Sequence, residues 1–168
     1  MKKILSLTII AVLMAGIFMT TASAADKFAY VDLSRVFSEY GKTKDYDKVF
    51  EGKQSAYISE RDKKIEDVKQ LEDKMNLLSE KQKESKKEEY DKKVQSLKEF
   101  IRQKETDLRK EQDEKMQEIL KDIEEAVKSY SEKQGFTLVF NDRVLVYQDK
   151  SLDITDKVIG ILNKSYKK

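Results

Sequence analysis

The stretch from Leu71 to Val94, LEDKMNLLSEKQKESKKEEYDKKV, decides the fold. Apolar residues recur at helical spacings of three and four up to Leu78 and again from Tyr90, but the segment 79–89 contains no apolar side chain. Leu71 and Tyr90 each begin a four-then-three pattern, yet their separation is not a whole number of heptads, so the apolar seam changes phase. A rod with one continuous partner keeps its phase, whereas two legs of a hairpin need not. We therefore expect a helical hairpin with its tip near 79–89.

The flanking sequence extends this helical pattern to an arm over 42–134. The segment 53–134 includes no glycine or proline, and more than half of its side chains are charged. The expected legs, 42–78 and 90–134, are similar in length. Nothing in the polar stretch breaks a helix, so a single unbroken helix of more than about 100 Å remains the alternative.

The two ends of the chain have a different, β-rich character. The segment KFAYVDL at 27–33 alternates like a strand, and it runs into a short helix with Asp32 as N-cap and Gly41 as the residue that stops it. Near the other end, FTLVF and VLVYQ flank NDR and predict a β-hairpin, followed by a closing helix with Thr155 as N-cap.

A helical hairpin brings these ends together into one body, formed by 25–41 and 135–168. Three short strands make a marginal core with exposed edges. We therefore expect an α+β chain whose body is completed by self-association.

The segment 1–24 is typical of a secretory signal peptide. A basic MKK precedes the apolar run ILSLTIIAVLMAGIF, and Ala22-Ser23-Ala24 is a small-x-small site that predicts cleavage between Ala24 and Ala25. Without Lys2 and Lys3, the basic side chains equal the acidic ones in number. This neutral charge gives no support for bulk attraction to nucleic acid or to an anionic membrane.

The sequence offers little for catalysis. It has no cysteine and no histidine, so it lacks the usual nucleophile–base pairs and the usual zinc ligands. Carboxylates alternate with lysines along helices, which is typical of solvated, salt-bridged faces. We expect no enzyme activity, no cofactor and no metal. Four apolar residues of the arm are candidate contacts for a bound polypeptide: Phe50, Tyr57, Leu77 and Phe100. Gly52 is a candidate pivot of the arm.

Two terminal motifs, YVDLSRVF at 30–37 and VLVY at 144–147 with DITDKVIGILN at 153–163, resemble the Skp (OmpH-like) periplasmic chaperones. The resemblance spans essentially the whole chain after the signal segment. It implies a homotrimer in which strands of three subunits form a small β-barrel body and three helical-hairpin arms project around a cavity. It also implies which residues build the trimer body: Tyr30, Val31, Leu33, Val36, Phe37, Leu138, Val139, Val144, Leu145, Tyr147, Ile154, Val158, Ile159 and Leu162.

The function implied by the resemblance is an ATP-independent holdase for unfolded outer-membrane proteins in the periplasm. This sequence departs from the family in charge, because well-known members are strongly basic and this chain is neutral. Contact with lipopolysaccharide or a membrane is therefore left open. The alternative from another class is an exported structural coiled-coil spacer or adaptor of the cell envelope.

Overall fold

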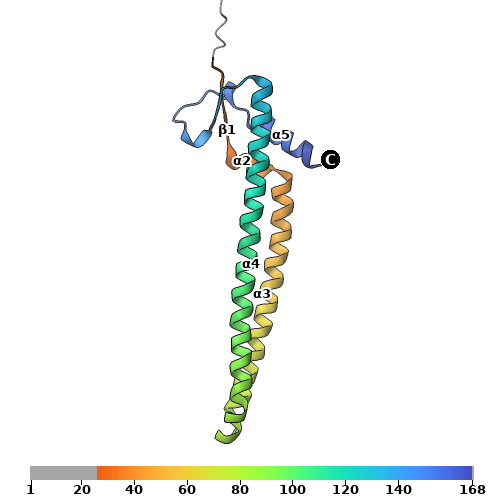
Figure 1. Ribbon diagram of the computed structural model, residues 1–168, viewed down its shortest axis with the longest axis vertical. Helices are drawn as coiled ribbons and strands as arrows, with labels where there is room; N and C mark the ends of the chain where they lie inside the picture. The colour runs from red at the N-terminus through yellow and green to blue at the C-terminus, as the bar shows by residue number, and fades with distance from the viewer. Residues whose placement is uncertain (1–25, 168) are drawn as a thin grey trace, which may run out of the picture.

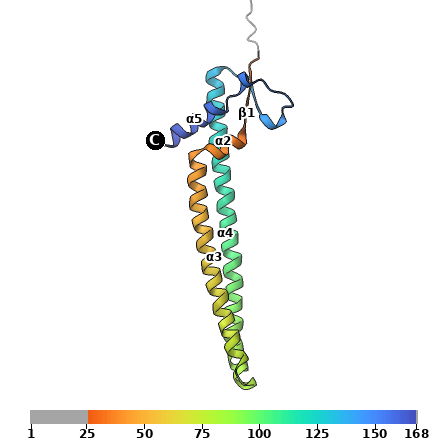
Figure 2. The ribbon, with the colours of Figure 1, turned by 180° about the vertical axis from the view of Figure 1, so that it is seen from behind.

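The computed structural model describes residues 26–167, so the signal segment and the Ala24–Ala25 bond lie outside the described residues. The protein is a long helical arm with a small body at one end (Figure 1). The view from behind shows that the C-terminal helix and the first strand both belong to this body (Figure 2).

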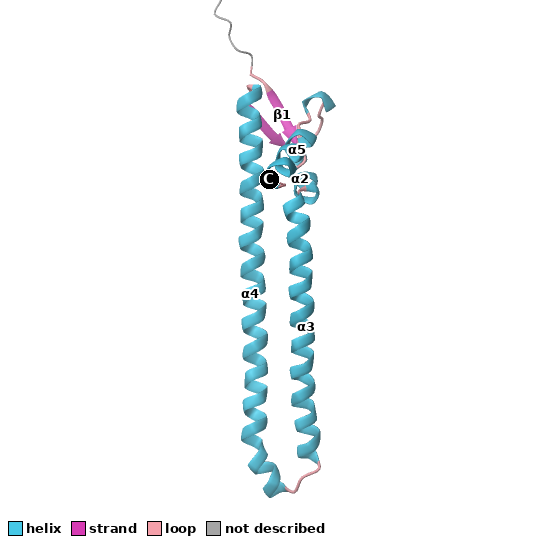
Figure 3. Ribbon diagram, turned by 90° about the vertical axis from the view of Figure 1, so that its right-hand side faces the viewer, coloured by secondary structure: helices cyan, strands magenta, loops and turns pink. Residues whose placement is uncertain are grey.

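The arm is an antiparallel hairpin of α3 (Gly41–Asn76) and α4 (Glu80–Gln134). Figure 3 shows the two legs side by side, joined by a short turn at the end far from the body. The helical hairpin is thus present and the unbroken helix is not. The legs are unequal: at 1.5 Å per residue, α3 is about 54 Å long and α4 about 80 Å. The surplus length of α4 carries it past the start of α3 and into the body.

The turn of the hairpin is tighter than the sequence predicted. It consists of residues 77–79, and the polar stretch that was expected to form the tip is the first part of α4 instead. The side chain of Gln82 accepts hydrogen bonds from the Ser79 backbone N–H at 3.2 Å and from the Ser79 hydroxyl at 2.8 Å. This contact begins α4 immediately after the turn.

Ion pairs along the helix explain why the polar stretch remains helical without an apolar seam. Lys83 pairs with Glu80, Lys86 with Glu89, and Lys92 with Glu88, all at spacings of three or four residues. Such pairs each stabilise a helix by a few tenths of a kcal/mol. The absence of apolar residues therefore marks the beginning of the second leg and not a loop.

The body contains β1 (Phe28–Val31), α2 (Leu33–Glu39), β2 (Leu138–Asn141), two 3-10 turns, η1 (Asp142–Val144) and η2 (Lys150–Leu152), and α5 (Thr155–Tyr166). The strands β1 and β2 pair in parallel, with Phe28 opposite Leu138 and Val31 opposite Asn141. Residues near the two ends of the chain thus meet in one sheet, which the hairpin arm makes possible.

The predicted β-hairpin of FTLVF and VLVYQ is wrong. Asn141 accepts a hydrogen bond from the Arg143 backbone N–H at 3.3 Å, and a 3-10 turn follows in place of a hairpin turn. The VLVYQ segment, residues 144–148, forms no strand after this turn. Its β-branched and aromatic residues favour a strand, but no strand within residues 26–167 pairs with it.

The predicted helix starts are partly correct. Asp32 is the N-cap of α2, and its carboxylate accepts a hydrogen bond from the Arg35 backbone N–H at 2.9 Å. The prediction that Gly41 ends the first helix in a left-handed conformation is wrong, because Gly41 is the first residue of α3 and its φ is not positive. The predicted N-cap Thr155 is wrong by one residue, since Ile154 is the N-cap of α5. The Thr155 hydroxyl instead accepts a hydrogen bond from the Asp32 backbone N–H at 2.9 Å, which ties the two helix starts together.

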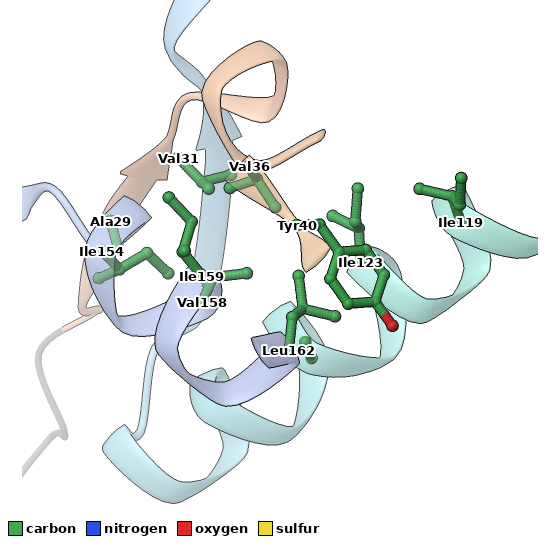
Figure 4. Close-up of a cluster of buried hydrophobic side chains, with 11 residues drawn as sticks. Ala29, Val31, Val36, Tyr40, Ile119, Ile123, Ile154, Val158, Ile159 and Leu162 are labelled. Atoms are coloured by element: carbon green, nitrogen blue, oxygen red, sulfur yellow. The ribbon is translucent and has the colours of Figure 1, made fainter. Parts of the chain in front are cut away.

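The core lies where α2, α5 and the upper part of α4 meet beside β1 (Figure 4). Val36 and Val158 are fully buried, and Ile119 is 1% exposed. Because Ile119, Ile123 and Ala126 of α4 are part of this cluster, the second leg of the arm is also a wall of the body.

Candidate functional site

An apolar groove of about 480 Å³ lies between β2 and the upper part of α4. Leu120, Ile123 and Val127 line it from α4, and Leu138 and Phe140 line it from the sheet. Leu120 is 48% exposed and Leu138 is 51% exposed in the single chain. The body thus presents apolar side chains that its own core does not cover.

The segment after β2 is the second uncovered apolar surface. Val144 and Tyr147 are largely exposed, and Val146 is fully exposed. With only two strands in the described part of the chain, the sheet also has backbone groups on β2 that no third strand pairs. An open sheet edge beside an apolar groove is a surface that pairs readily with another extended segment.

The residues implied for a trimer body divide into three groups in the single chain. Seven are buried in the chain's own body: Tyr30, Val31, Val36, Ile154, Val158, Ile159 and Leu162. Four are partly buried: Leu33, Phe37, Val139 and Leu145. Three are exposed: Leu138, Val144 and Tyr147. The buried group supports the fold of each chain, so the exposed and partly buried residues are the ones available for assembly.

The candidate contacts on the arm are not equivalent. Tyr57 is buried between the legs, where its ring lies 6.0 Å from that of Phe100 and its hydroxyl donates a hydrogen bond to Glu105 at 3.2 Å. The second leg covers Tyr57 in this hairpin. Contact of Tyr57 with a client stays a prediction. Phe100 is partly buried by the same pairing, and Phe50 is partly buried with its ring 5.6 Å from Tyr46. Leu77, at the turn, is 88% exposed.

Gly52 lies on an exposed part of α3, and no heavy atom lies within 4 Å of a Cβ placed there. The helix continues through it without a break. Its role as a pivot stays a prediction.

A polar network at the root of the arm was not predicted from the sequence. Lys42 of α3 donates to Asp122 of α4 at 2.7 Å and pairs with Glu118 at 2.5 Å. Tyr40 donates a hydrogen bond to the same Asp122 at 3.0 Å. The partners come from opposite legs and lie far apart in the sequence, and lysines and carboxylates are common throughout both legs, so no local signal distinguishes them.

The pKa shifts in this network follow from its contacts. Burial, together with the hydrogen bond to Asp122, raises the pKa of Tyr40 to about 12. Burial opposes the charged form of Lys42, but its hydrogen bonds to Asp122 and Glu118 outweigh that effect and raise its pKa. Hydrogen bonds from Lys115 and Lys42 lower the pKa of Glu118 to about 2. Lys42 and Glu118 are thus both charged near neutral pH, and their pairing ties the two legs together beside the body.

Between residues 26 and 167, no group of three or more Asp or Glu residues is placed to hold a metal ion. Within the same range, no helix has the length and apolarity needed to cross a membrane. The candidate surfaces described above are the groove, the exposed segment after β2 and the arm.

Comparison with known proteins places this arrangement in a family. A family model described as outer membrane protein (OmpH-like) matches residues 27–162. A crystal structure of a proposed OmpH-like outer membrane chaperone from Caulobacter crescentus CB15 has the same fold, with a TM-score of 0.74 at 12% sequence identity. The match covers 84% of this chain and 86% of that chain. No curated protein matches the sequence. Since the family model spans the whole arm and nearly all of the body, the chain belongs to the OmpH-like family.

Proposed function

We propose that this protein is an ATP-independent holdase chaperone of the periplasm, which encloses unfolded outer-membrane proteins between three helical arms. Its family is one of outer-membrane chaperones and not of enzymes, which supports the general role. The observation that carries the specific proposal is the incomplete body: a two-stranded sheet beside an uncovered apolar groove, at the base of a long arm.

An isolated two-stranded sheet is marginally stable in water. The groove and the exposed segment 144–148 are different surfaces of the same chain. When one copy binds another through two different surfaces, the contact is head-to-tail, and it forms a ring when the rotation between copies closes. We propose that 144–148 of one chain adds a strand beside β2 of the next, and that three copies close the β-barrel body.

Three arms on one ring surround a central space. Each arm offers only weak contacts to an extended polypeptide, but three arms hold it at a high effective concentration. Leu77 at the tip is the most exposed candidate contact, with the partly buried Phe50 and Phe100 along the arm. Binding by many weak contacts needs no ATP and no cofactor, and release follows when the client folds elsewhere.

The segment 1–24 supports a periplasmic location. Its basic start, apolar run and cleavage site before Ala25 are those of an exported protein. An outer-membrane protein crosses that compartment unfolded, so this is where a holdase with such arms meets its clients.

Native mass spectrometry of the chain 25–168 tests the proposal. We expect a trimer that gains one client chain when a urea-unfolded outer-membrane barrel protein is rapidly diluted into it, and no binding of the same barrel already folded. A monomer or dimer, or a trimer that never captures the client, contradicts the proposal and favours the structural spacer.

A matched pair of variants tests the assembly surface. Val146 is fully exposed in the single chain, so Val146→Lys leaves the fold of each chain intact but places a charge in the proposed interface. Val49→Lys makes the same change at a 55% exposed position on the arm. We expect Val146→Lys to dissociate the trimer and Val49→Lys to leave it unchanged. Equal behaviour of the two variants contradicts the proposed interface.

A further inference from the structure

The joint between the body and the first leg of the arm is one residue long. The helix α2 ends at Glu39 and α3 begins at Gly41, while Tyr40 between them is extended, with φ −68° and ψ 125°. Such a joint changes the direction of the chain and offers a place to bend. The contacts around it therefore decide how firmly α3 is attached to the body.

Asn163, near the end of α5, bonds to both sides of this joint. Its side-chain oxygen accepts a hydrogen bond from the Gly41 backbone N–H at 2.7 Å. Its side-chain nitrogen donates to the Glu39 carbonyl at 3.1 Å. The N–H at the start of a helix and a carbonyl at the end of one both lack partners within their own helices. One amide side chain satisfies both, and it does so from the opposite end of the sequence.

Tyr166, one turn further along α5, extends the contact into the arm. Its hydroxyl donates a hydrogen bond to Asp45 of α3 at 3.0 Å, and its ring lies 5.8 Å from that of Tyr40 in an edge-on arrangement. Gly41 is closely covered by this helix. A Cβ on Gly41 would lie 3.2 Å from the Asn163 side-chain oxygen and 3.3 Å from the Tyr166 ring. The close approach of α5 favours a residue without a side chain at this position.

The arm is thereby attached to the body at two points. One is α4, which is continuous from Glu80 to Gln134 and contributes Ile119 and Ile123 to the core. The other is α3, through the last turn of α5. Long helices curve gently, so a second attachment beside α4 restricts bending of the arm in the plane that contains both helices.

We propose that the last turn of α5 is a brace that fixes the angle between arm and body, with Asn163 as its positioning residue. This inference rests on the proposed function in one respect, because the arm angle then sets the width of the client cavity in the trimer. The brace itself is a property of the single chain.

The brace places the flexible point of the arm at Tyr40–Gly41 and not at Gly52. Beside Gly52, Lys53 pairs with Glu111 of α4, and α4 has no glycine anywhere along its length. Bending at Gly52 would therefore require α4 to bend beside Gly52, where α4 has no glycine. Bending at the root also bends α4, but α3 already begins there after the extended Tyr40. The contacts that hold α3 in place at that level are those to α5 and the Lys42 pairs with Glu118 and Asp122.

Spin-label distances measure the arm angle directly. The chain has no native cysteine, so Ser59→Cys on the arm and Lys157→Cys on α5 give a specific pair of labels. Labelled chain is mixed with an excess of unlabelled chain, so that each measured distance is intramolecular. We expect a narrow distribution in the parent protein and a broader one in Asn163→Ala. Asn163→Asp keeps the acceptor for Gly41 but loses the donor to Glu39, and its distribution is expected to lie between the two.

Three further variants make the result specific. Tyr166→Phe keeps the ring but loses the bond to Asp45, so it broadens the distribution less than Asn163→Ala does. Lys164→Ala changes an exposed neighbour on α5, and Gly52→Ala stiffens the alternative pivot; both are expected to leave the distribution of the parent protein unchanged. If Gly52→Ala narrows the distance distribution and Asn163→Ala leaves it unchanged, the proposed brace is overturned.

Amide hydrogen exchange gives a second readout that a general loss of stability does not imitate. Loss of the Asn163 bond is expected to speed exchange of the Gly41 amide about tenfold, with exchange in β1 and at the start of α5 unchanged. Equal acceleration throughout the body overturns a local brace.

Gly41→Ala tests the brace from the other side, because its methyl group would press against Asn163 and Tyr166. We expect it to broaden the distance distribution in the parent protein and to add little in Asn163→Ala, as interacting residues are not additive. Independent, additive effects overturn the proposed coupling.

Client capture is measured last and separately. If the distances change in Asn163→Ala while trimers capture clients of a wider size range, both the brace and the holdase are supported. If the distances change and no variant binds a client, the holdase has failed and the brace stands. If the distances do not change, the brace has failed, whatever the clients do.

Discussion

At the scale of single residues, Glu118 shows how the arm root responds to acid. Hydrogen bonds from Lys115 and Lys42 lower its pKa from 4.5 to about 2, so the folded protein favours the charged carboxylate. The contribution of Glu118 to stability is therefore present above pH 4.5 and is lost as the pH falls from there to about 2. Its side chain is 42% exposed, so solvent screening reduces the size of this contribution.

Glu118→Gln is expected to lower the free energy of unfolding by less than about 1 kcal/mol at pH 7. Urea titrations at several pH values measure this difference. It should be unchanged at pH 5 and should disappear between pH 4.5 and about 2, where the parent protein also becomes protonated. Glu114→Gln is the control, because its partner Lys110 lies 3.9 Å away and both side chains are exposed. A difference that grows as the pH falls contradicts the assigned role.

At the scale of elements, the turn of the hairpin separates two neighbouring leucines. Leu77 is 88% exposed, whereas Leu78 is partly buried against the legs. We expect Leu77→Ser to leave stability within about 0.5 kcal/mol, because surface changes rarely cost more. Leu78→Ser should be clearly destabilising, since it removes apolar area from the seam. Urea titration distinguishes the two.

The same pair tests the proposed client contact at the tip. Leu77→Ser should weaken capture of an unfolded barrel protein while the proposed trimer and the stability of the chain remain intact. An unchanged affinity for the client would show that the tip makes no contact and that the holding surface lies nearer the body.

The elements also show what the sequence can and cannot predict. The phase change of the apolar seam correctly indicated two legs, because it depends on packing between neighbouring helices. The position of the turn was wrong, since ion pairs within the first turns of α4 keep a helix without apolar residues. The strand predicted at 144–148 is absent because the segment, despite its strand propensity, has no strand to pair with in the described chain. The arm-root network and Asn163 join residues of common types across long separations, so no local pattern reveals them.

At the scale of the whole molecule, the charge of the chain indicates whether a client is held by electrostatic attraction or by apolar contact and enclosure. Without the segment 1–24, the chain carries equal numbers of basic and acidic side chains, and many of them pair along the arm. Such pairs leave little net field around the arm, because exposed charges of both signs are screened within about 8–10 Å at physiological salt. Holding should then depend mainly on apolar contact and enclosure.

We therefore expect client affinity to change by less than about threefold between roughly 0.05 and 0.5 M salt, since a neutral surface has no net charge to screen. Fluorescence titration of a labelled, unfolded barrel protein at fixed residual urea measures this. The Leu77→Ser variant should bind the client more weakly at every salt concentration, and its affinity should change with salt as little as that of the parent protein. A steep loss of affinity with salt would mean that the trimer gathers basic residues on the inner faces of its arms, so that the charge of the assembled cavity differs from that of the chain.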